Sequence, residues 1–341
     1  MKKLTLVLFA IVATIALSCQ SGSEGDTVNV YTHRHYAVDQ EIFALFTEET
    51  GIRVNVINAS ADELIQRMET EGENSPADLL ITVDAGRLNR AHDKGLLQAF
   101  ASDQLTALVP AQYRHPDGFW YGMTTRARII AYAKDRVNPD EIQDYADLAD
   151  PKWKGRVLVR SSDNVYNQSL LASIIAAEGE AEATAWANGV VANLAREPKG
   201  SDRDQVKAIA GGEGDLTIVN TYYIGQLLNS DNEEERKAGE AVGIIFPNQS
   251  NRGTHVNVSG FGVAKHAKNK ENAIQLAEFL LSEPVQQKLA LANYEYPLNP
   301  NVEMADLLAQ WGTFKRDSIN LSLLGDFNEK AIKVFDAAGW N

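Results

Sequence analysis

The stretch Asp215-Leu-Thr-Ile-Val-Asn-Thr-Tyr-Tyr-Ile-Gly225 changes within a few residues from the pattern of a strand to that of a helix. Its β-rich beginning is followed by Asn220 and later by Gly225, which permit a sharp corner. Adjacent tyrosines on a continuing strand would point to opposite faces of a sheet. On the first turn of a helix they lie about 100° apart and can face one centre. The stretch therefore predicts a strand-to-helix corner with Tyr222 and Tyr223 side by side.

The same change of pattern recurs along the chain. β-rich runs occupy residues 28–31, 53–57, 78–82, 156–159 and 215–219. Helical periods occupy residues 39–50, 61–71, 168–178, 182–195 and 270–281. Helix start signals stand at Ser60 and Ser282, and stop signals at Gly51, Gly95 and Gly179. Alternation of this kind predicts an α/β fold with parallel or mixed sheets covered by helices.

Composition narrows the class of protein. The chain has 341 residues, 44% hydrophobic and 23% charged, which excludes a disordered, collagenous or coiled-coil protein. Its length suggests about two domains, because single cores rarely exceed roughly 250 to 300 residues. The formal charge of -14 repels phosphates and anionic lipid, so the composition argues against nucleic-acid binding.

The first residues have the pattern of an export signal. Lys2 and Lys3 precede the apolar run 4–17, which is too short to span a bilayer, so residues 1–18 are predicted to be a signal peptide. Cys19, the only cysteine, resembles the lipidated residue of a bacterial lipobox, with residues 19–26 as the tether. The alternative is an ordinary signal-peptidase cut after Ser18. Both alternatives export the protein, to the periplasm or the cell surface, without an internal disulfide.

Five ordered motifs resemble those of a known family. They are Arg34-His-Tyr36, Asn164-Val-Tyr-Asn-Gln168, Ser201-Asp-Arg-Asp-Gln205, Asn220-Thr-Tyr-Tyr-Ile-Gly225 and Asn257-Val-Ser-Gly-Phe-Gly-Val263. Over nearly all of residues 27–341 the chain resembles periplasmic solute-binding proteins, and within them the ferric-iron-binding proteins of ABC importers.

The resemblance implies a type II periplasmic-binding-protein fold, in which two α/β lobes of mixed sheets enclose a ligand cleft. We expect residues 27–125 plus 248–297 to form the first lobe and residues 126–247 plus 298–341 to form the second. The candidate crossing strands between the lobes are residues 126–132 and 242–247.

The resemblance also implies a metal site. It assigns Tyr166, Tyr222 and Tyr223 as ligands, and the Arg-His-Tyr motif adds Tyr36 and His35. In some members of the family the histidine stays unbound, so its role is left open. In open α/β sheets ligands lie beyond the carboxyl ends of strands, and we expect Tyr36 and Tyr166 in the loops that follow two such strands.

Phenol chemistry points to the same cation. A phenol has a pKa of about 10, so near neutral pH only a strongly Lewis-acidic cation displaces its proton. Calcium and magnesium prefer carboxylate, carbonyl and water oxygens, which leaves Fe(III) as the natural partner. The alternative for any single tyrosine is packing with a hydrogen-bonded hydroxyl. We interpret Tyr132, Tyr294 and Tyr296 in that way.

Several charged residues are expected to support the site. Arg126 corresponds to an arginine that faces the cleft in the family, where it either holds a synergistic anion such as carbonate or stabilises the phenolates from behind the ligands. The alternative is a salt bridge that crosses between the lobes. Arg34, Asp202 and Arg203 are interpreted as supports, and His33 as a solvated residue.

The leading hypothesis is a monomeric, exported binding protein that captures Fe(III) and passes it to an inner-membrane ABC permease. No dinucleotide, P-loop, nucleophile-elbow or zinc-protease motif is found, so we expect no enzyme activity and no nucleic-acid partner. Contact with the membrane is expected only through a lipid on Cys19. Two alternatives stay open: a binding protein of the same fold for a polyamine, thiamine or phosphonate, and an iron-containing periplasmic enzyme.

Overall fold

The computed structural model describes residues 26–34 and 36–341. The strands are β1 (Thr27–Thr32), β2 (Arg53–Asn58), β3 (Leu79–Val83), β4 (Tyr121–Ala133), β5 (Val157–Leu158), β6 (Leu216–Asn220), β7 (Val242–Ile245), β8 (Val256–Val263) and β9 (Tyr296–Pro297). The helices are α1 (Ala37–Thr50), α2 (Ala61–Glu71), α3 (Ala85–Asp93), α4 (Asp103–Leu108), α5 (Val165–Glu178), α6 (Glu180–Ala192), α7 (Asp202–Ala210), α8 (Thr221–Leu228), α9 (Glu233–Ala241), α10 (Lys270–Leu280), α11 (Glu283–Asn293), α12 (Asp306–Gln310), α13 (Leu323–Asp326) and α14 (Asn328–Ala338). Each strand and helix expected from the sequence is present, and the α/β fold is confirmed.

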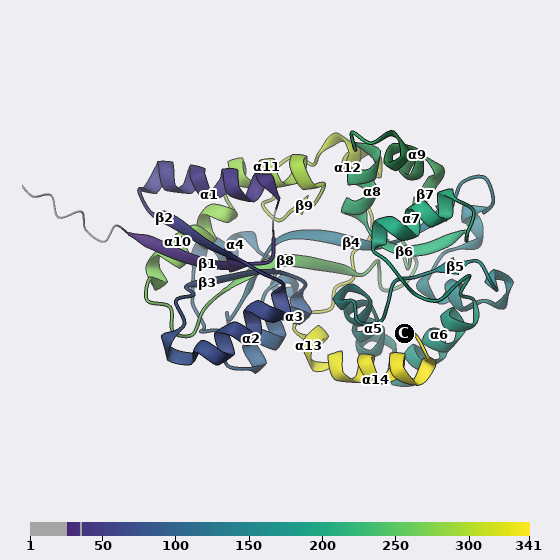
Figure 1. Ribbon diagram of the computed structural model, residues 1–341, viewed down its shortest axis with the longest axis horizontal. Coiled ribbons are helices and arrows are strands. Elements are labelled where there is room, and N and C mark those ends of the chain that lie inside the picture. Colours follow the sequence, from purple (N-terminus) through teal and green to yellow (C-terminus); the bar gives the residue numbers. More distant parts are fainter. Residues whose placement is uncertain (1–25, 35) are drawn as a thin grey trace, which may run out of the picture.

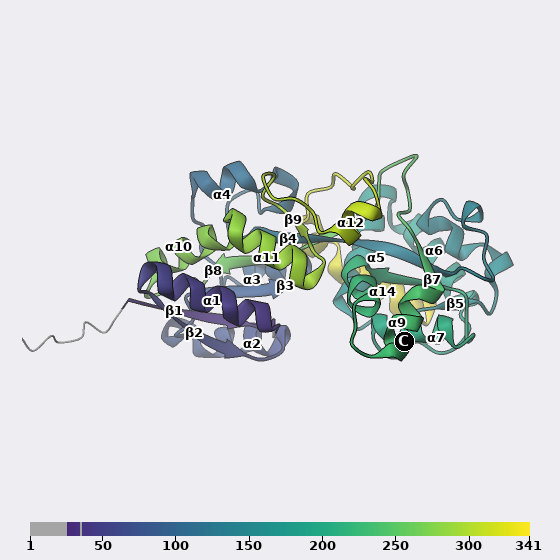
Figure 2. The same ribbon diagram turned by 90° about the horizontal axis from the view of Figure 1, so that it is seen from above.

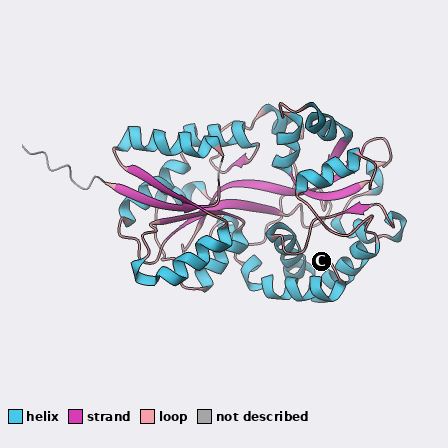
Figure 3. Cartoon of the chain, in the orientation of Figure 1, coloured by secondary structure: helices cyan, strands magenta, loops and turns pink. Residues whose placement is uncertain are grey.

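The strands form a mixed sheet in the order β2-β1-β3-β8-β4-β6-β5, with β7 and β9 also paired to β4 (Figure 3). Strand β1 is parallel to β2 and β3, and β5 is parallel to β6. Strand β8 is antiparallel to both of its neighbours. This mixture places the carboxyl ends of β1, β3 and β6, each followed by a helix, toward the middle of the molecule.

Strand β4 connects the two halves of the molecule. Its first part, Tyr121–Ala127, pairs with β8, and its last part, Arg128–Tyr132, pairs with β6. Figure 1 shows β4 running from one group of helices to the other. The expected crossing strand 126–132 lies within β4, while β7 covers the first four residues of the segment 242–247 and pairs with Ile130–Ala133. The exact lobe boundaries stay a prediction.

Helices cover both faces of each half. In Figure 1, α1 and α11 lie on one side of β1 and β2, while α2 lies on the other. In the second half, α7, α8 and α9 face α5, α6 and α14 across the strands (Figure 1), and the view from above shows the helices of the two halves of the molecule apart from each other (Figure 2). The C-terminal Trp340 is fully buried against Trp186 and Phe335, which fixes α14 to α6.

The helix boundaries follow the expected signals. Ser60 and Glu63 form a reciprocal capping box at the start of α2. Gly51 ends α1 in the left-handed conformation, with φ of 77°. Gly179 ends α5, and Ser282 precedes α11, whose first turn contains a proline. Local capping signals therefore mark these helix ends.

Some sequence-based expectations concern residues that are not described. The signal peptide, the lipobox Cys19 and nearly all of its tether, and the candidate ligand His35 lie outside the described residues. Across residues 26–34 and 36–341 there is no helix long and apolar enough to cross a membrane.

Candidate metal centre

Tyr222 and Tyr223 lie where the sequence predicts, on the first turn of α8 directly after β6. Asn220 is the N-cap residue, in an extended conformation, so the chain turns from strand to helix within one residue. The two aromatic rings have their centroids 4.2 Å apart and are inclined by 37°. The corner therefore presents two phenols to one region of space.

Tyr166 approaches the same region from α5. We expected it in a loop, but it lies in the first turn of the helix, which begins at Val165. The reason is the side chain of Asn164, which caps the helix by accepting a hydrogen bond of 3.0 Å from the Tyr166 amide. The hydroxyl of Tyr222 donates to the hydroxyl of Tyr166 over 3.2 Å. Two phenol oxygens from separate helices thus meet directly.

Tyr36 comes from the other half of the molecule. It is the N-cap residue of α1, after the carboxyl end of β1, and is half-buried. It lies close enough to Tyr166 that negative charge on one phenol would disfavour ionisation of the other. A side-chain hydrogen bond also connects Tyr36 to Gln226 of α8. The structure thus brings four of the five predicted metal ligands, Tyr36, Tyr166, Tyr222 and Tyr223, to one place.

Burial makes several of these phenols difficult to ionise. It raises the pKa of Tyr36 to about 12, assisted by the nearby negative charge of Glu295. Burial also raises the pKa of Tyr222 well above its usual value, as do the neighbouring phenols of Tyr166 and Tyr223. The pKa of Tyr223 is raised for the same main reason. Without a cation these three side chains are neutral phenols at neutral pH.

Three guanidinium groups surround the ring of Tyr166. The Cζ atoms of Arg126 and Arg128 both lie 5.7 Å from the ring centroid, and that of Arg160 lies 5.8 Å away. Arg128 and Arg160 also pair with the buried Asp202, at 2.8 and 3.6 Å. Cations in such positions stabilise negative charge that develops on the phenols.

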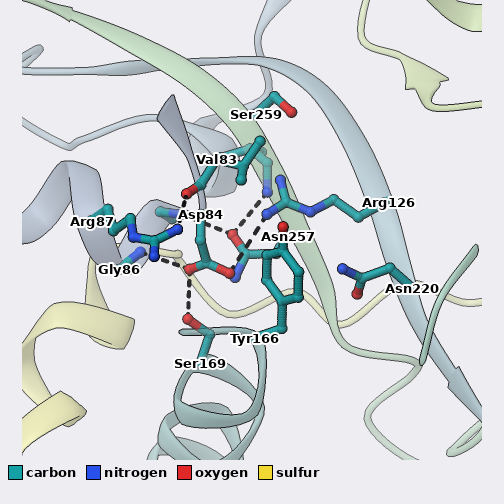
Figure 4. A network of polar contacts seen from close by, with 12 residues as sticks. Val83, Asp84, Gly86, Arg87, Arg126, Tyr166, Ser169, Asn220, Asn257 and Ser259 are labelled. Atoms are coloured by element: carbon teal, nitrogen blue, oxygen red, sulfur yellow. Dashed lines mark hydrogen bonds and ion pairs between the residues drawn. The ribbon is translucent and has the colours of Figure 1, made fainter. Parts of the chain in front are cut away.

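Arg126 faces Asp84 in the network of Figure 4. Both side chains are about 1% exposed, and Nη2 of Arg126 lies 3.5 Å from Oδ2 of Asp84. The other carboxylate oxygen of Asp84 accepts hydrogen bonds from Ser169 Oγ over 2.5 Å and from the Gly86 amide over 2.9 Å. Neither Nη1 nor Nη2 of Arg126 has a hydrogen-bond partner among the described residues, and both are buried. Such donors fit an additional anion.

Arg34, which was predicted to be a support of the site, lies beside Tyr36. Its guanidinium donates to Asp39 over 2.9 Å, to Ser259 over 3.1 Å and to Glu295 over 3.2 Å. Its Cζ atom lies 5.3 Å from the centroid of the Tyr36 ring. Burial alone would raise the pKa of the Glu295 carboxyl, but Arg34 and Ser259 hold it below its usual value. Glu295 is therefore a buried carboxylate near the candidate site.

The other residues that were interpreted as supports or as solvated also have defined contacts. Asp202 is fully buried at the start of α7, and Arg203 donates to Gln226. His33, interpreted as solvated, is partly buried, and its Nδ1 lies 3.3 Å from Thr82 Oγ1. Sequence reasoning did not identify Asp84 or Glu295. Asp84 could have been considered, because it lies two residues after the predicted strand 78–82, at the end of a strand where ligands are expected.

The donors that meet here are phenols rather than the commoner metal ligands. Among residues 26–34 and 36–341, no group of three or more His, Cys, Asp and Glu side chains is arranged to hold a metal ion. A site of phenol oxygens selects a hard, highly charged cation, since only such a cation displaces phenol protons at neutral pH.

Comparisons with known proteins point in the same direction. A family model described as bacterial extracellular solute-binding protein matches residues 74–316. Iron uptake protein A1 of Synechocystis is 51% identical over 317 residues, covering 93% of this chain and 88% of that protein. Iron uptake protein A2 of the same organism is 46% identical over 94% of this chain and 92% of its own length.

Solved structures agree with the fold. A Trichodesmium protein, IdiA (FutA), in complex with iron and citrate ligands has a TM-score of 0.90 and 47% identity, over 92% of this chain and all of that chain. The ferric binding protein from Campylobacter jejuni has a TM-score of 0.88 and 45% identity, over 92% of this chain and all of its own. The expected two-lobed binding-protein architecture with mixed sheets is confirmed.

Proposed function

The chain belongs to the bacterial extracellular solute-binding protein family, and we propose that it captures Fe(III) outside the cytoplasm and delivers it to an ABC permease. Its similarity to iron uptake proteins over nearly its whole length supports this function. The ligands we propose are Tyr36, Tyr166, Tyr222 and Tyr223. His35 is proposed as a further ligand that completes the set.

The observation that carries the proposal is the convergence of phenols from two helices, with the hydroxyls of Tyr166 and Tyr222 3.2 Å apart. Holding a phenol of pKa about 10 ionised at pH 7 costs roughly 4 kcal/mol, and burial increases that cost for most of these tyrosines. Only a bound cation that gains strong bonds to phenolate oxygen offsets such a cost. Fe(III) is the cation whose hardness and charge fit these donors.

We assign a synergistic anion, such as carbonate or citrate, to the region of Arg126. The buried Nη1 and Nη2 atoms of that guanidinium lack hydrogen-bond partners among the described residues, and the Nδ2 atoms of Asn220 and Asn257 share this property. A small carboxylate or carbonate would accept from these donors beside the metal. The observed pair with Asp84 spans 3.5 Å and leaves this donor capacity unused.

The charges around the site argue against an organic cation such as a polyamine. Three guanidinium groups lie within 6 Å of the Tyr166 ring centroid and would repel an ammonium group. We also propose that the protein is a monomeric carrier without enzyme activity, because its relatives over nearly the whole chain are iron uptake proteins. It is held at the membrane by a lipid on Cys19.

Iron analysis with a visible spectrum tests the proposal. Purified protein incubated with ferric citrate and then desalted should retain about one iron per chain and absorb visible light through a phenolate-to-iron charge-transfer band. Protein that stays colourless and free of iron would refute the assignment. A spermidine competitor should leave the iron content unchanged.

A further inference from the structure

Gly225 lies on α8, two and three residues after the tyrosines that we propose as ligands. A Cβ atom built on Gly225 would lie 2.6 Å from Cγ and 2.7 Å from Cβ of Tyr294. Carbon atoms do not approach so closely in folded proteins, so any side chain at Gly225 would force one of the two elements to move. Helix α8 therefore packs directly against Tyr294 because this residue is glycine.

The backbone of Tyr294 is held in a defined conformation. It follows the end of α11 in the left-handed conformation, with φ of 55° and ψ of 34°, and its amide donates to the Ala290 carbonyl over 3.1 Å. Few residues other than glycine adopt this conformation. The atoms that face Gly225 are at the base of the side chain, where rotation of the ring gives no relief. The distance between α8 and Tyr294 is therefore fixed by this contact.

The next residue connects this contact to the opposite side of the candidate site. Glu295 accepts hydrogen bonds from Ser259 Oγ over 2.8 Å and from Arg34 Nη1 over 3.2 Å. Arg34 in turn lies over the ring of Tyr36. Tyr294 and Glu295 therefore touch α8 on one side and the support of Tyr36 on the other. In Figure 1, α11 lies with β1 in one half of the molecule, whereas α8 lies in the other.

We propose that the contact between Gly225 and Tyr294 positions the iron ligands. It sets how closely α8 lies against the end of α11, and thereby the separation of Tyr222 and Tyr223 from Tyr36. Tyr294, a packing residue by its sequence, is thus a positioning residue for metal binding. This inference rests on the proposed capture of Fe(III), which the iron content and visible spectrum of the wild-type protein test separately.

The first test is Gly225→Ala, measured by competition with citrate for Fe(III) and by the visible spectrum. We expect affinity to fall by about tenfold or more, which corresponds to about 1.4 kcal/mol, and the absorption maximum to shift. Gly189→Ala is the matched control. A Cβ there would lie 2.5 Å from Cβ of Ala149, a similar clash, but on α6 and without a contact to the proposed ligands. It should lower the melting temperature and leave iron binding unchanged.

The second test removes the opposing side chain. In a Tyr294→Gly background, Gly225→Ala should no longer weaken iron binding, because the three atoms nearest to the added methyl group all belong to the deleted side chain. Tyr294→Gly alone should weaken the affinity for Fe(III) and shift the absorption maximum. This single variant tests whether Tyr294 positions the ligands even if Gly225→Ala does not fold. Equal penalties for Gly225→Ala in both backgrounds, or unchanged affinity and spectrum in Tyr294→Gly, would overturn the inference. If the wild-type protein itself binds no iron, the proposed function is wrong instead.

Discussion

Replacing Tyr36 by phenylalanine removes one phenol oxygen and leaves the shape of the side chain nearly unchanged. We expect the substitution to weaken Fe(III) binding by a factor that depends on pH. The reason is that the phenol must lose its proton before it can bind the metal, whereas the phenylalanine variant releases no proton at this position. The ratio of the two affinities therefore reports on this single proton.

The structure gives the size of the effect. With the pKa of Tyr36 raised to about 12, holding the phenol ionised at pH 7 costs about 7 kcal/mol, at about 1.4 kcal/mol per pKa unit. Since this pKa lies far above pH 8, the free protein carries the proton throughout the range from pH 5 to 8. The affinity ratio of wild type to Tyr36→Phe should then rise about tenfold for each pH unit, or about a thousandfold over the range.

The assay is competition for Fe(III) against nitrilotriacetate, followed through the phenolate-to-iron band, with both proteins measured in the same solutions. Hydrolysis of iron and protonation of the chelator then cancel in the ratio. A complementary measurement adds the iron chelate to weakly buffered protein and records the protons released. Tyr36→Phe should release about one proton fewer per iron than the wild type.

Tyr132→Phe provides the control, since Tyr132 lies on β4 and is interpreted as a packing residue. Its affinity should equal that of the wild type at every pH. If the ratio for Tyr36→Phe stays constant between pH 5 and 8, Tyr36 does not bind iron as a phenolate, and the assignment of this ligand is wrong. A ratio that flattens above pH 6 would show that the phenol ionises much more easily than its burial implies.

Four further predictions follow from the site and the fold. Tyr222→Phe and Tyr223→Phe should keep the melting temperature within a few degrees while sharply weakening iron binding and bleaching or shifting the visible band; unchanged colour in both would place the site elsewhere. Arg126→Gln should abolish the increase in iron affinity on adding bicarbonate or citrate, measured by titration in anion-depleted buffer, and a persistent increase would exclude the anion role. Cys19→Ala should move the protein from the membrane fraction to the soluble fraction on immunoblots of separated cells, whereas a wild type that is already soluble would contradict lipid anchoring. Trp340→Ala should lower the free energy of unfolding by about 3 to 5 kcal/mol in urea titrations, because it empties a fully buried site; a loss below about 1 kcal/mol would contradict that role in packing.

Local patterns were sufficient to predict five strands and five helices, each of which the structure contains. The capping box at Ser60 and the stop at Gly51 depend on residues within one helical turn, so a single sequence contains the whole signal. The length of β4 was not predicted. Its 13 residues are nearly all buried and take their partners from several strands that lie far apart in the chain. No alternation of polar and apolar residues marks the ends of such a strand.

The tyrosines of the site were predictable for the same reason, because a strand-to-helix corner is a local feature. Their surroundings were not. Ser169 donates to Asp84 across a separation of 85 residues, and Arg34 reaches Glu295 across 261. A sequence pattern of strands and helices does not predict which distant side chains are in contact. Glu295 lies shortly after a helix, where acidic residues are usually exposed to solvent, so nothing in the sequence marks it as buried. Only the tertiary structure shows these two carboxylates beside the phenols.

Those carboxylates make the two sides of the candidate site electrically unequal. Around Tyr166, three guanidinium groups face the carboxylates of Asp84 and Asp202, which leaves one positive charge in excess within that set. Beside Tyr36, one guanidinium faces two carboxylates, which leaves one negative charge. The excess of positive charge therefore lies on the side where the buried donors of Arg126 lack hydrogen-bond partners among the described residues. An anion that accompanies the metal is thus expected beside Arg126 and not beside Tyr36.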